Sequence, residues 1–240
     1  MLFWVSFFAN QQIDKTVESV GLSHPTIFRM RHKILLSLEA EEERMPTMLD
    51  GVCELDDTYV LESYKGTKIP EDYWRGARKH GAKAQKRGIS NEYLSISTGI
   101  ERDGEAFTKT VTRATPSKED IITVFGGHIG KDTLILCDGD ANYKALSENN
   151  ECAVKNVDKN SGKGFYNINT INSYHSFIKS RYNQYRGVAS KYLNRYNVLF
   201  SKTFRSDSEL ADEVYKKITS NENNHYHNIN DVETLGLLDI

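Results

Sequence analysis

The chain lacks the residues on which disulfide frameworks and zinc ribbons depend. Its 240 residues contain only three cysteines, Cys53, Cys137 and Cys152, and none of them forms a CxxC pair. This distribution excludes both kinds of site and is typical of a protein from a reducing compartment. We therefore expect a core held by hydrophobic burial, which a chain of this length can build.

Long apolar runs are missing as well. The opening MLFWVSFF is apolar but short, has no basic flank and is followed by polar residues. A signal peptide or a membrane span needs a longer apolar run with different flanks. We interpret this segment as a core helix or strand and expect no membrane partner.

Acidic residues are absent from Lys159 to Arg205, although the whole chain has a formal charge of −2. The block carries nine cations among repeated aromatic residues, namely Lys159, Lys163, Lys179, Arg181, Arg186, Lys191, Arg195, Lys202 and Arg205. Such a segregated basic and aromatic block indicates a polyanionic partner, because phosphate neutralisation dominates nucleic-acid affinity. From Ser206 onward the net charge is −6, which is typical of a solvated, partly disordered tail.

Residues 14–39 predict two helices around a tight turn. Gly21 ends the first helix, Ser23 can cap the second, and Pro25 falls in its first turn, where a missing N–H is tolerated. The string GLSHPTIFRMRHKI resembles a helix-turn-helix recognition helix, and an ordinary helical hairpin with a basic face fits it equally well. The candidate DNA contacts on this helix are Arg29, Arg31 and Lys33.

Beyond the acidic connector EAEEERMPTMLD the pattern changes from helices to strands. The predicted strands are 51–59, 93–100, 105–112, 133–137 and 152–157, and the predicted helices are 116–125, 142–149 and 168–186. This order predicts an α/β fold with a mixed sheet flanked by helices. We expect a helical module over 1–45, a sheet domain over 46–205 and a tail over 206–240.

Two acids occupy informative places in the predicted sheet. Asp56 lies on the first strand, where alternation puts Glu54 on the same face, and Asp138 follows the apolar strand LILC. Taken singly, each acid is better explained as structural, and Asp138 beside Gly139 is typical of a turn or helix cap.

The two acids gain meaning beside the helix that begins near residue 168. Two Mg²⁺ ions about 4 Å apart can clamp the attacking and leaving oxygens of a phosphodiester, and Mg²⁺ prefers oxygen ligands. A third ligand from this acid-free helix would have to be Asn169, Asn172 or His175.

Several strings in order resemble a known family. ELDDTYV, RGIS, LCDGDANY, NTINSYHSFIK and GVASKYLNRY are similar to the catalytic domain of bacterial insertion-sequence transposases with a ribonuclease H-like fold. The match is to the group whose triad is Asp, Asp and either Glu or Asn, and it runs from about Thr16 to Phe200. The resemblance implies a ribonuclease H-like sheet behind a small helix-turn-helix module. It also implies Mg²⁺ or Mn²⁺ as the cofactor, with two ions bound.

The resemblance also implies roles for individual residues. Asp56 and Asp138 become the first two metal ligands and Asn172 the third. Lys179 lies seven residues beyond Asn172, on the same helical face, and is expected to contact DNA phosphate. His175 could join that face, but an ordinary surface or capping role is favoured for it.

The chain departs from the resembled group in two ways. Such proteins commonly begin with a zinc ribbon, and the absence of cysteine pairs here predicts a truncated or naturally shortened form. Asp57 stands where Glu is more usual after the first Asp.

A second basic segment, RGARKHGAKAQKRG, contains no acid and is rich in glycine and alanine. We expect a loop that closes over DNA through Arg78, Lys79, Lys83, Lys86 and Arg87. The acid-free block adds the candidate contacts Arg181, Arg186 and Lys191. The tyrosines of this block could stack on bases, although aromatic stripes at helical spacing are more often core.

The leading hypothesis is a metal-dependent DNA transposase that hydrolyses phosphodiesters at element ends and transfers the strand to target DNA. Its implied partners are double-stranded DNA and further copies of itself, in the cytoplasm at the nucleoid. Two alternatives remain: an inactive or truncated DNA-binding relative that regulates transposition, and a nuclease on the same fold.

Overall fold

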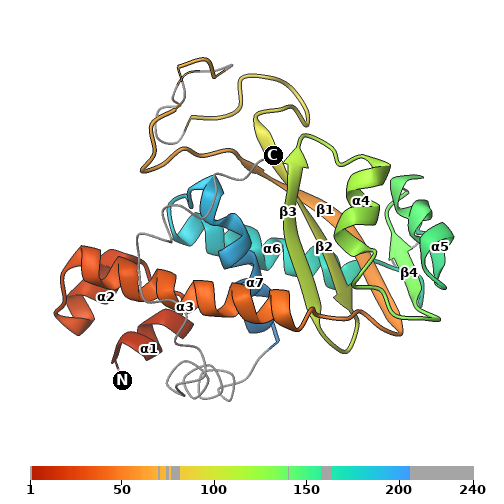
Figure 1. The fold of residues 1–240 in the computed structure, drawn as a ribbon, viewed down its shortest axis with the longest axis horizontal. Helices are drawn as coiled ribbons and strands as arrows, with labels where there is room; N and C mark the ends of the chain where they lie inside the picture. The colour runs from red at the N-terminus through yellow and green to blue at the C-terminus, as the bar shows by residue number, and fades with distance from the viewer. Residues whose placement is uncertain are drawn as a thin grey trace.

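One five-stranded mixed sheet organises the protein (Figure 1). The structure is a computed structural model that describes residues 2–69, 71–73, 76, 82–139, 141–157 and 164–205. The strand order is β3-β2-β1-β4-β5. The β1–β2 and β2–β3 pairs are antiparallel, and the β1–β4 and β4–β5 pairs are parallel. The strands are β1 Val52–Leu61, β2 Tyr93–Glu101, β3 Ala106–Arg113, β4 Leu134–Cys137 and β5 Ala153–Asn156.

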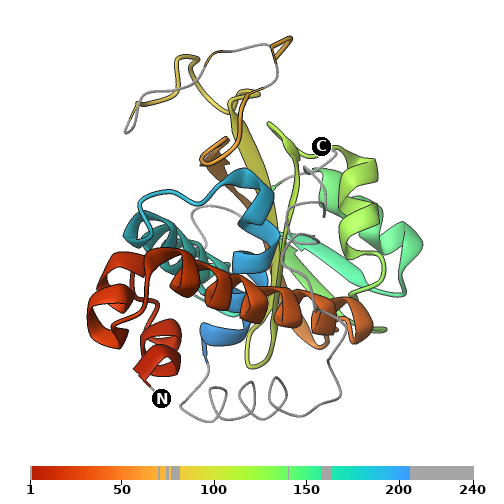
Figure 2. The same cartoon turned by 60° about the vertical axis from the view of Figure 1, so that its left-hand side comes forward.

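Helices cover both faces of the sheet. They are α1 Leu2–Phe8, α2 Ile13–Val20, α3 His24–Arg44, α4 Lys118–Phe125, η1 Ala141–Lys144, α5 Ala145–Asn149, α6 Asn169–Gln184, η2 Ser190–Tyr192 and α7 Leu193–Thr203. α6 and α7 lie on one face with α3 outside α7, while α4 and α5 lie on the other (Figures 1 and 2). The predicted α/β fold, a ribonuclease H-like mixed sheet flanked by helices, is confirmed.

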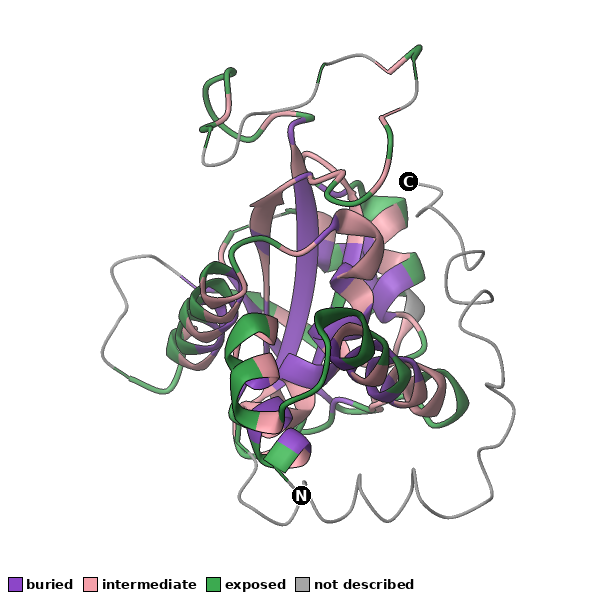
Figure 3. Ribbon diagram, turned by 90° about the vertical axis from the view of Figure 1, so that its left-hand side faces the viewer, coloured by how far each residue is buried: buried purple, intermediate pink, exposed green. Residues whose placement is uncertain are grey.

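Each face of the sheet has its own hydrophobic core. Ile96 of β2 packs with Ile178 of α6 and Phe200 of α7 on one side. Leu55 of β1 packs with Phe125 of α4 on the other. Figure 3 shows the buried positions gathered along the sheet and on the helix faces turned toward it. The central strands are therefore covered on both sides.

The predicted pair of helices around a tight turn is present as α2 and α3. Gly21 ends α2 in the left-handed region at φ 75°, which a residue without Cβ adopts at little cost. Ser23 caps α3 by accepting a hydrogen bond from the Thr26 amide, and Pro25 lies in the first turn. These features follow from local sequence alone.

The first three helices share a core with the sheet. Phe3 and Phe7 of α1 and Leu35 of α3 belong to the same buried cluster as β2, α6 and α7. The segment MLFWVSFF is thus a core helix, one of the two forms predicted for it. Arg195 of α7 also pairs with Glu39 of α3 at 3.1 Å, so the helical segment is tied to the sheet by charge as well.

Three details differ from the sequence prediction. α4 begins at Lys118 rather than at 116, because Ser117 and Asp120 form a reciprocal capping box. β2 ends at Glu101, one residue beyond the predicted end, and it is buried at nearly every position because helices cover both faces. The predicted helix over 142–149 begins as the 3₁₀ turn η1 at Ala141.

Among the helices of the described ranges, none combines the length and the apolar character that crossing a membrane requires. The acidic tail predicted over 206–240 lies outside the described residues.

Candidate active site beneath helix α6

Two aspartates directly follow paired residues of neighbouring parallel strands. Leu55 of β1 is paired with Cys137, the last residue of β4, and Asp56 and Asp138 are the next residues along the chain. Residues at equivalent positions of neighbouring strands point to the same face, about 4.8 Å apart. Both side chains are half-buried. Carboxylates at such positions would repel each other if their side chains met, and a cation between them would relieve the repulsion.

A buried glutamate anchors α6 above these aspartates. Glu54 is fully buried on the same face of β1 as Asp56, and its carboxylate accepts a hydrogen bond from the Ile171 amide at 3.0 Å. Arg102 donates to the same carboxylate at 2.8 Å and to the Asn167 carbonyl at 2.8 Å. The first turn of α6 is therefore held on β1 by a charge-assisted network.

His175 is the α6 residue that reaches Asp56. Its Nδ1 lies 3.6 Å from Asp56 Oδ2, and its side chain is buried. Burial, and secondarily the charge of Lys179, lowers the pKa of His175 to about 4, so the ring is neutral near pH 7. The favoured interpretation of His175 as a surface or capping residue is therefore wrong. Periodicity alone could not show which residue of this face turns toward the sheet.

Asn172 and Lys179 are exposed residues of α6. Asn172 is one turn before His175, and Lys179 is one turn after it, so both share the side of the helix that carries His175. The meeting of Asp56, Asp138, Asn172 and Lys179 in one site remains a prediction. Across the described parts of the chain, no three His, Cys, Asp or Glu side chains form a metal cluster. The predicted ligand set contains only two residues of those types.

The candidate DNA contacts of α3 have different environments. Arg29 and Lys33 are exposed, as predicted. Arg31 is only 2% exposed, which excludes it from a DNA surface and corrects the prediction. Its guanidinium donates to the Gln11 carbonyl at 2.5 Å and lies 5.2 Å from the ring centroid of Tyr185. Arg31 therefore joins α3 to α6 instead of facing solvent.

The candidate contacts in the basic loop are exposed where the structure describes them. They are Lys83, Lys86 and Arg87, whereas Arg78 and Lys79 lie outside the described residues. The amides of Gln85 and Lys86 donate to Glu92 at 2.8 and 2.9 Å. This end of the loop is thereby fastened to the start of β2.

The candidates from the acid-free block divide by exposure. Arg186, at the end of α6, is exposed. Arg181 is half-buried, with its guanidinium 4.9 Å from the Phe177 ring centroid, and Lys191 is half-buried beside Tyr192. The side chains of Tyr174, Tyr182 and Tyr196 are buried, as the core interpretation of this stripe predicts.

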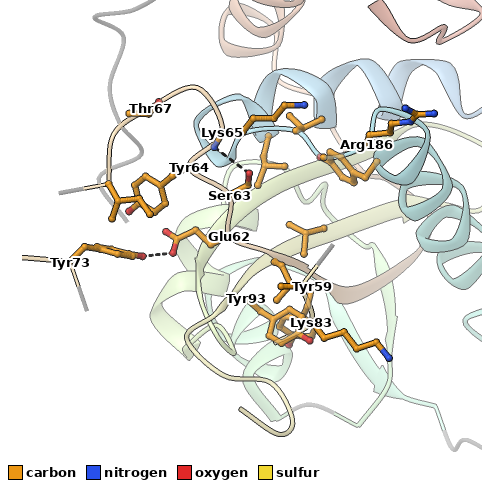
Figure 4. A pocket seen from close by; sticks show the side chains of 18 of the residues that line it. Tyr59, Glu62, Ser63, Tyr64, Lys65, Thr67, Tyr73, Lys83, Tyr93 and Arg186 are labelled. Carbon is orange, nitrogen blue, oxygen red and sulfur yellow. Dashed lines mark hydrogen bonds between the residues drawn. The ribbon is translucent and has the colours of Figure 1, made fainter. Parts of the chain in front are cut away.

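Sequence reasoning missed a large cavity next to the site. It lies between the carboxyl half of α6 and the segment that follows β1, and its volume is about 1530 Å³ (Figure 4). Lys179 and Arg186 line it from α6, and Lys65 and Lys83 line it from the opposite segment. Runs of lysine and tyrosine in 59–83 were the signal available in the sequence, but their convergence with α6 depends on the fold.

The sheet order and the paired aspartates beneath α6 place the protein in the class of ribonuclease H-like α/β domains with an acidic edge. Residues 48–207, more than half of the chain, match the family described as ISXO2-like transposase domain. The chain belongs to this family. No curated protein is similar enough to the chain to count as a match.

Three solved structures show a distant likeness. An intasome of simian T-cell lymphotropic virus in complex with PP2A regulatory subunit B56 gamma is 8% identical, with a TM-score of 0.36, and covers 84% of this chain. The present chain spans 65% of the length of that protein. A pre-cleavage Mos1 transpososome and the Mos1 strand transfer complex are 9% and 11% identical, with TM-scores of 0.34 and 0.35. Each covers 87% of this chain, which spans 71% and 70% of them. The assignment rests on the family match.

Proposed function

We propose that the protein is a metal-dependent DNA transposase that cuts element ends and joins them to target DNA. The observation that carries the proposal is the adjacency of Asp56 and Asp138 beneath α6, within a transposase-family domain. Arg29, Lys33, Lys83, Lys86, Arg87 and Arg186 are exposed and available for DNA phosphate.

The side chains present suit a hard divalent cation. Two half-buried carboxylates on one face and a neighbouring amide give an oxygen-rich set, which Mg²⁺ and Mn²⁺ prefer. Asp56, Asp138 and Asn172 would hold the ions. When bound, two ions would activate water and stabilise charge on the attacking and leaving oxygens.

The remaining residues position these groups. Glu54 and Arg102 hold the start of α6 on β1, and Asn172 directly follows the anchored Ile171. Neutral His175 packs against Asp56 and limits its rotation. Lys179 lies two turns beyond Asn172 and would bind a phosphate of the cut strand.

The reaction consists of two phosphoryl transfers without a covalent protein intermediate. Water attacks the phosphodiester at the element end, and the 3′ oxygen leaves and is protonated to a hydroxyl. That hydroxyl then attacks a phosphodiester of the target, forming one bond as another breaks. Positioning and charge neutralisation are the main contributions of the protein. Acting on two ends implies a homo-oligomer on DNA, which we place at the nucleoid.

Cleavage and joining assays test this proposal. Labelled DNA ends taken from the flanks of the gene are mixed with supercoiled plasmid and Mg²⁺ or Mn²⁺. We expect Asp138→Asn to abolish both reactions while DNA binding persists, and exposed Asp103→Asn, with the same charge change, to leave them intact. Binding without either reaction in the unmodified protein would favour the inactive regulator, and cleavage without joining would favour the nuclease. Undiminished activity of Asp138→Asn would contradict the assignment of Asp138.

Comparing Asn172→Ala with His175→Ala tests the third ligand. If Asn172 holds an ion, its loss raises the Mg²⁺ concentration needed for cleavage, whereas loss of His175 acts through Asp56 and weakens folding as well. A Mg²⁺ requirement that moves only with His175→Ala would assign the third position to the histidine.

A further inference from the structure

The cavity beside the active site has two walls of different origin. One wall is the end of α6 from Lys179 and the turn after it to Arg186, and the other is the segment that follows β1, including Ser63 to Lys68. The walls are joined at their base, where Ser63 and Ser190 exchange hydrogen bonds at 2.7 and 2.9 Å. We call this space the β1–α6 cavity. Its volume of about 1530 Å³ exceeds that of a pocket for a small ligand, which reaches roughly 1,000 Å³.

The β1–α6 cavity is lined mainly by positive charges and therefore favours an anionic ligand. Cations face it from both walls, namely Lys65, Lys68, Lys83, Lys179 and Arg186. Among the described residues two acids line it, and one of them, Glu62, is buried and paired with Arg113 at 2.7 Å. The other, Glu71, offsets part of the positive charge. Cations on opposite sides of a groove attract a chain of phosphates that passes between them.

Aromatic rings line the same space. Tyr64 and Tyr73 meet edge to face with centroids 4.9 Å apart, and the Tyr73 hydroxyl donates to Glu62, which holds the pair in place (Figure 4). Tyr59 and Tyr93 line the cavity from β1 and β2. Tyrosine rings bind nucleobases by stacking. In a duplex the base faces are covered by neighbouring bases, so rings inside a cavity can stack only on unpaired nucleotides.

The β1–α6 cavity continues the active-site face of α6. Lys179 belongs to both, and Arg186 lies seven residues further along the chain, two residues beyond the end of α6. The cations of the cavity therefore continue past the phosphate position proposed at Lys179.

We propose that the β1–α6 cavity binds a short unpaired DNA segment that continues from the cleaved phosphate. The inference rests on the proposed function, since that function places the cleaved phosphate at Lys179. Phosphates lie along Arg186 and Lys83, and bases stack on Tyr64 and Tyr93. DNA is thus held partly opened at the element end.

Fluorescence anisotropy with a labelled short oligothymidylate and, separately, a blunt duplex tests the proposal. We expect the double variant Lys83→Gln/Arg186→Gln to weaken oligothymidylate binding at least tenfold and duplex binding much less. The double variant Lys118→Gln/Lys131→Gln loses the same charge outside the cavity and should bind both probes normally. Equal losses for the two probes, or no loss for oligothymidylate, would overturn the proposal.

Tyr64→Leu tests the stacking contact without changing charge. We expect about tenfold weaker oligothymidylate binding with an unchanged salt dependence, because the phosphate contacts remain. Thermal unfolding checks that the variant is folded. If Tyr64→Leu folds and binds oligothymidylate as the unmodified protein does, bases do not stack here and the proposal fails.

Asp138→Asn separates this inference from the proposed function. This variant should bind oligothymidylate normally because the cavity does not include Asp138. Absence of cleavage by the unmodified protein would contradict the proposed function. The oligothymidylate binding assay would still test the cavity. Absence of oligothymidylate binding beside normal cleavage would contradict the cavity alone.

Discussion

Arg31 shows how a single buried cation can be mistaken for a DNA contact. Its guanidinium donates to the Gln11 carbonyl, in the loop between α1 and α2, and lies against the rings of Phe7 in α1 and Tyr185 just after α6. A charged group this deeply buried is retained because its partners replace water. Its role is therefore in folding.

Replacing Arg31 by Met should destabilise the protein by about 2–3 kcal/mol, because the Gln11 carbonyl loses its donor and the cation–π contacts disappear. Exposed Arg29→Met should change the unfolding free energy by less than about 0.5 kcal/mol. Urea unfolding measures both. An Arg31→Met protein of normal stability but weak DNA binding would restore the original interpretation.

The second residue-scale prediction concerns pH and His32. This histidine is buried, and burial, with the nearby charges of Arg195, Arg31 and Lys191, lowers its pKa from 6.5 to about 3. Below pH 6.5 His32 binds a proton in the unfolded chain but stays neutral in the folded chain. The free energy of unfolding therefore decreases as the pH falls toward 3.

Replacing His32 by Phe removes this proton linkage and keeps a ring among the aromatic neighbours Phe28 and Tyr192. Between pH 6.5 and 4 the unmodified protein should lose up to about 1.4 kcal/mol per pH unit relative to the variant. Urea unfolding across this range checks the slope, with exposed His24→Gln as the control. Parallel slopes for His32→Phe and the unmodified protein would refute the linkage.

At the scale of elements, the attachment of α6 to β1 decides the geometry of the site. The Glu54 carboxylate accepts hydrogen bonds from the Ile171 amide and from Arg102. Arg102 also donates to the Asn167 carbonyl just before α6. A strand residue thus satisfies an amide of the first helical turn, which otherwise has no partner within the helix.

Glu54→Ala should destabilise the fold by about 3 kcal/mol and loosen the start of α6, because Arg102 loses its counter-charge and the Ile171 amide its acceptor. Glu54→Gln keeps an acceptor and should lose about half as much. Hydrogen exchange at the start of α6 and the cleavage rate should change together, with DNA binding intact. Exposed Glu105→Gln is the matched control. Normal exchange in Glu54→Ala would show that something else holds the helix.

At the scale of the whole molecule, the helical segment and the sheet are joined by one core. Phe7 of α1 is 1% exposed and clusters with residues of β2, α6 and α7. The boundary at residue 45 between a helical module and a sheet domain remains a prediction. The shared core predicts that both parts unfold in one cooperative transition.

Phe7→Ala should destabilise the entire described fold by about 3–4 kcal/mol. Helical signal and tyrosine fluorescence should fall in one shared transition during thermal unfolding. Val5→Ala, on the exposed side of α1, should have little effect. Two separate transitions, with only the first moved by Phe7→Ala, would instead show independent modules.

Much of this fold was predictable because its signals are local. The turn at Gly21 with its cap at Ser23 is determined by a few neighbouring residues, and so is the apolar strand before Asp138. The burial of Arg31 and His175 and the convergence of Lys83 with Arg186 depend instead on partners more than a hundred residues away. No periodicity in one segment specifies which distant segment will cover it.

The pairing of β1 with β4 has a consequence for how this site can be inherited or damaged. β4 is four residues long, and its side chains alternate between Ile135 and Cys137 toward α4 and Leu136 toward α6. Gain or loss of one residue before Asp138 would reverse that alternation and turn its carboxylate to the wrong face. Such an insertion or deletion would leave Asp56, Asp138 and Asn172 in the sequence but would keep Asp138 from joining the other two at the site. A copy of this gene can therefore keep its whole motif and still encode an inert protein, so motif-based surveys would count it as active.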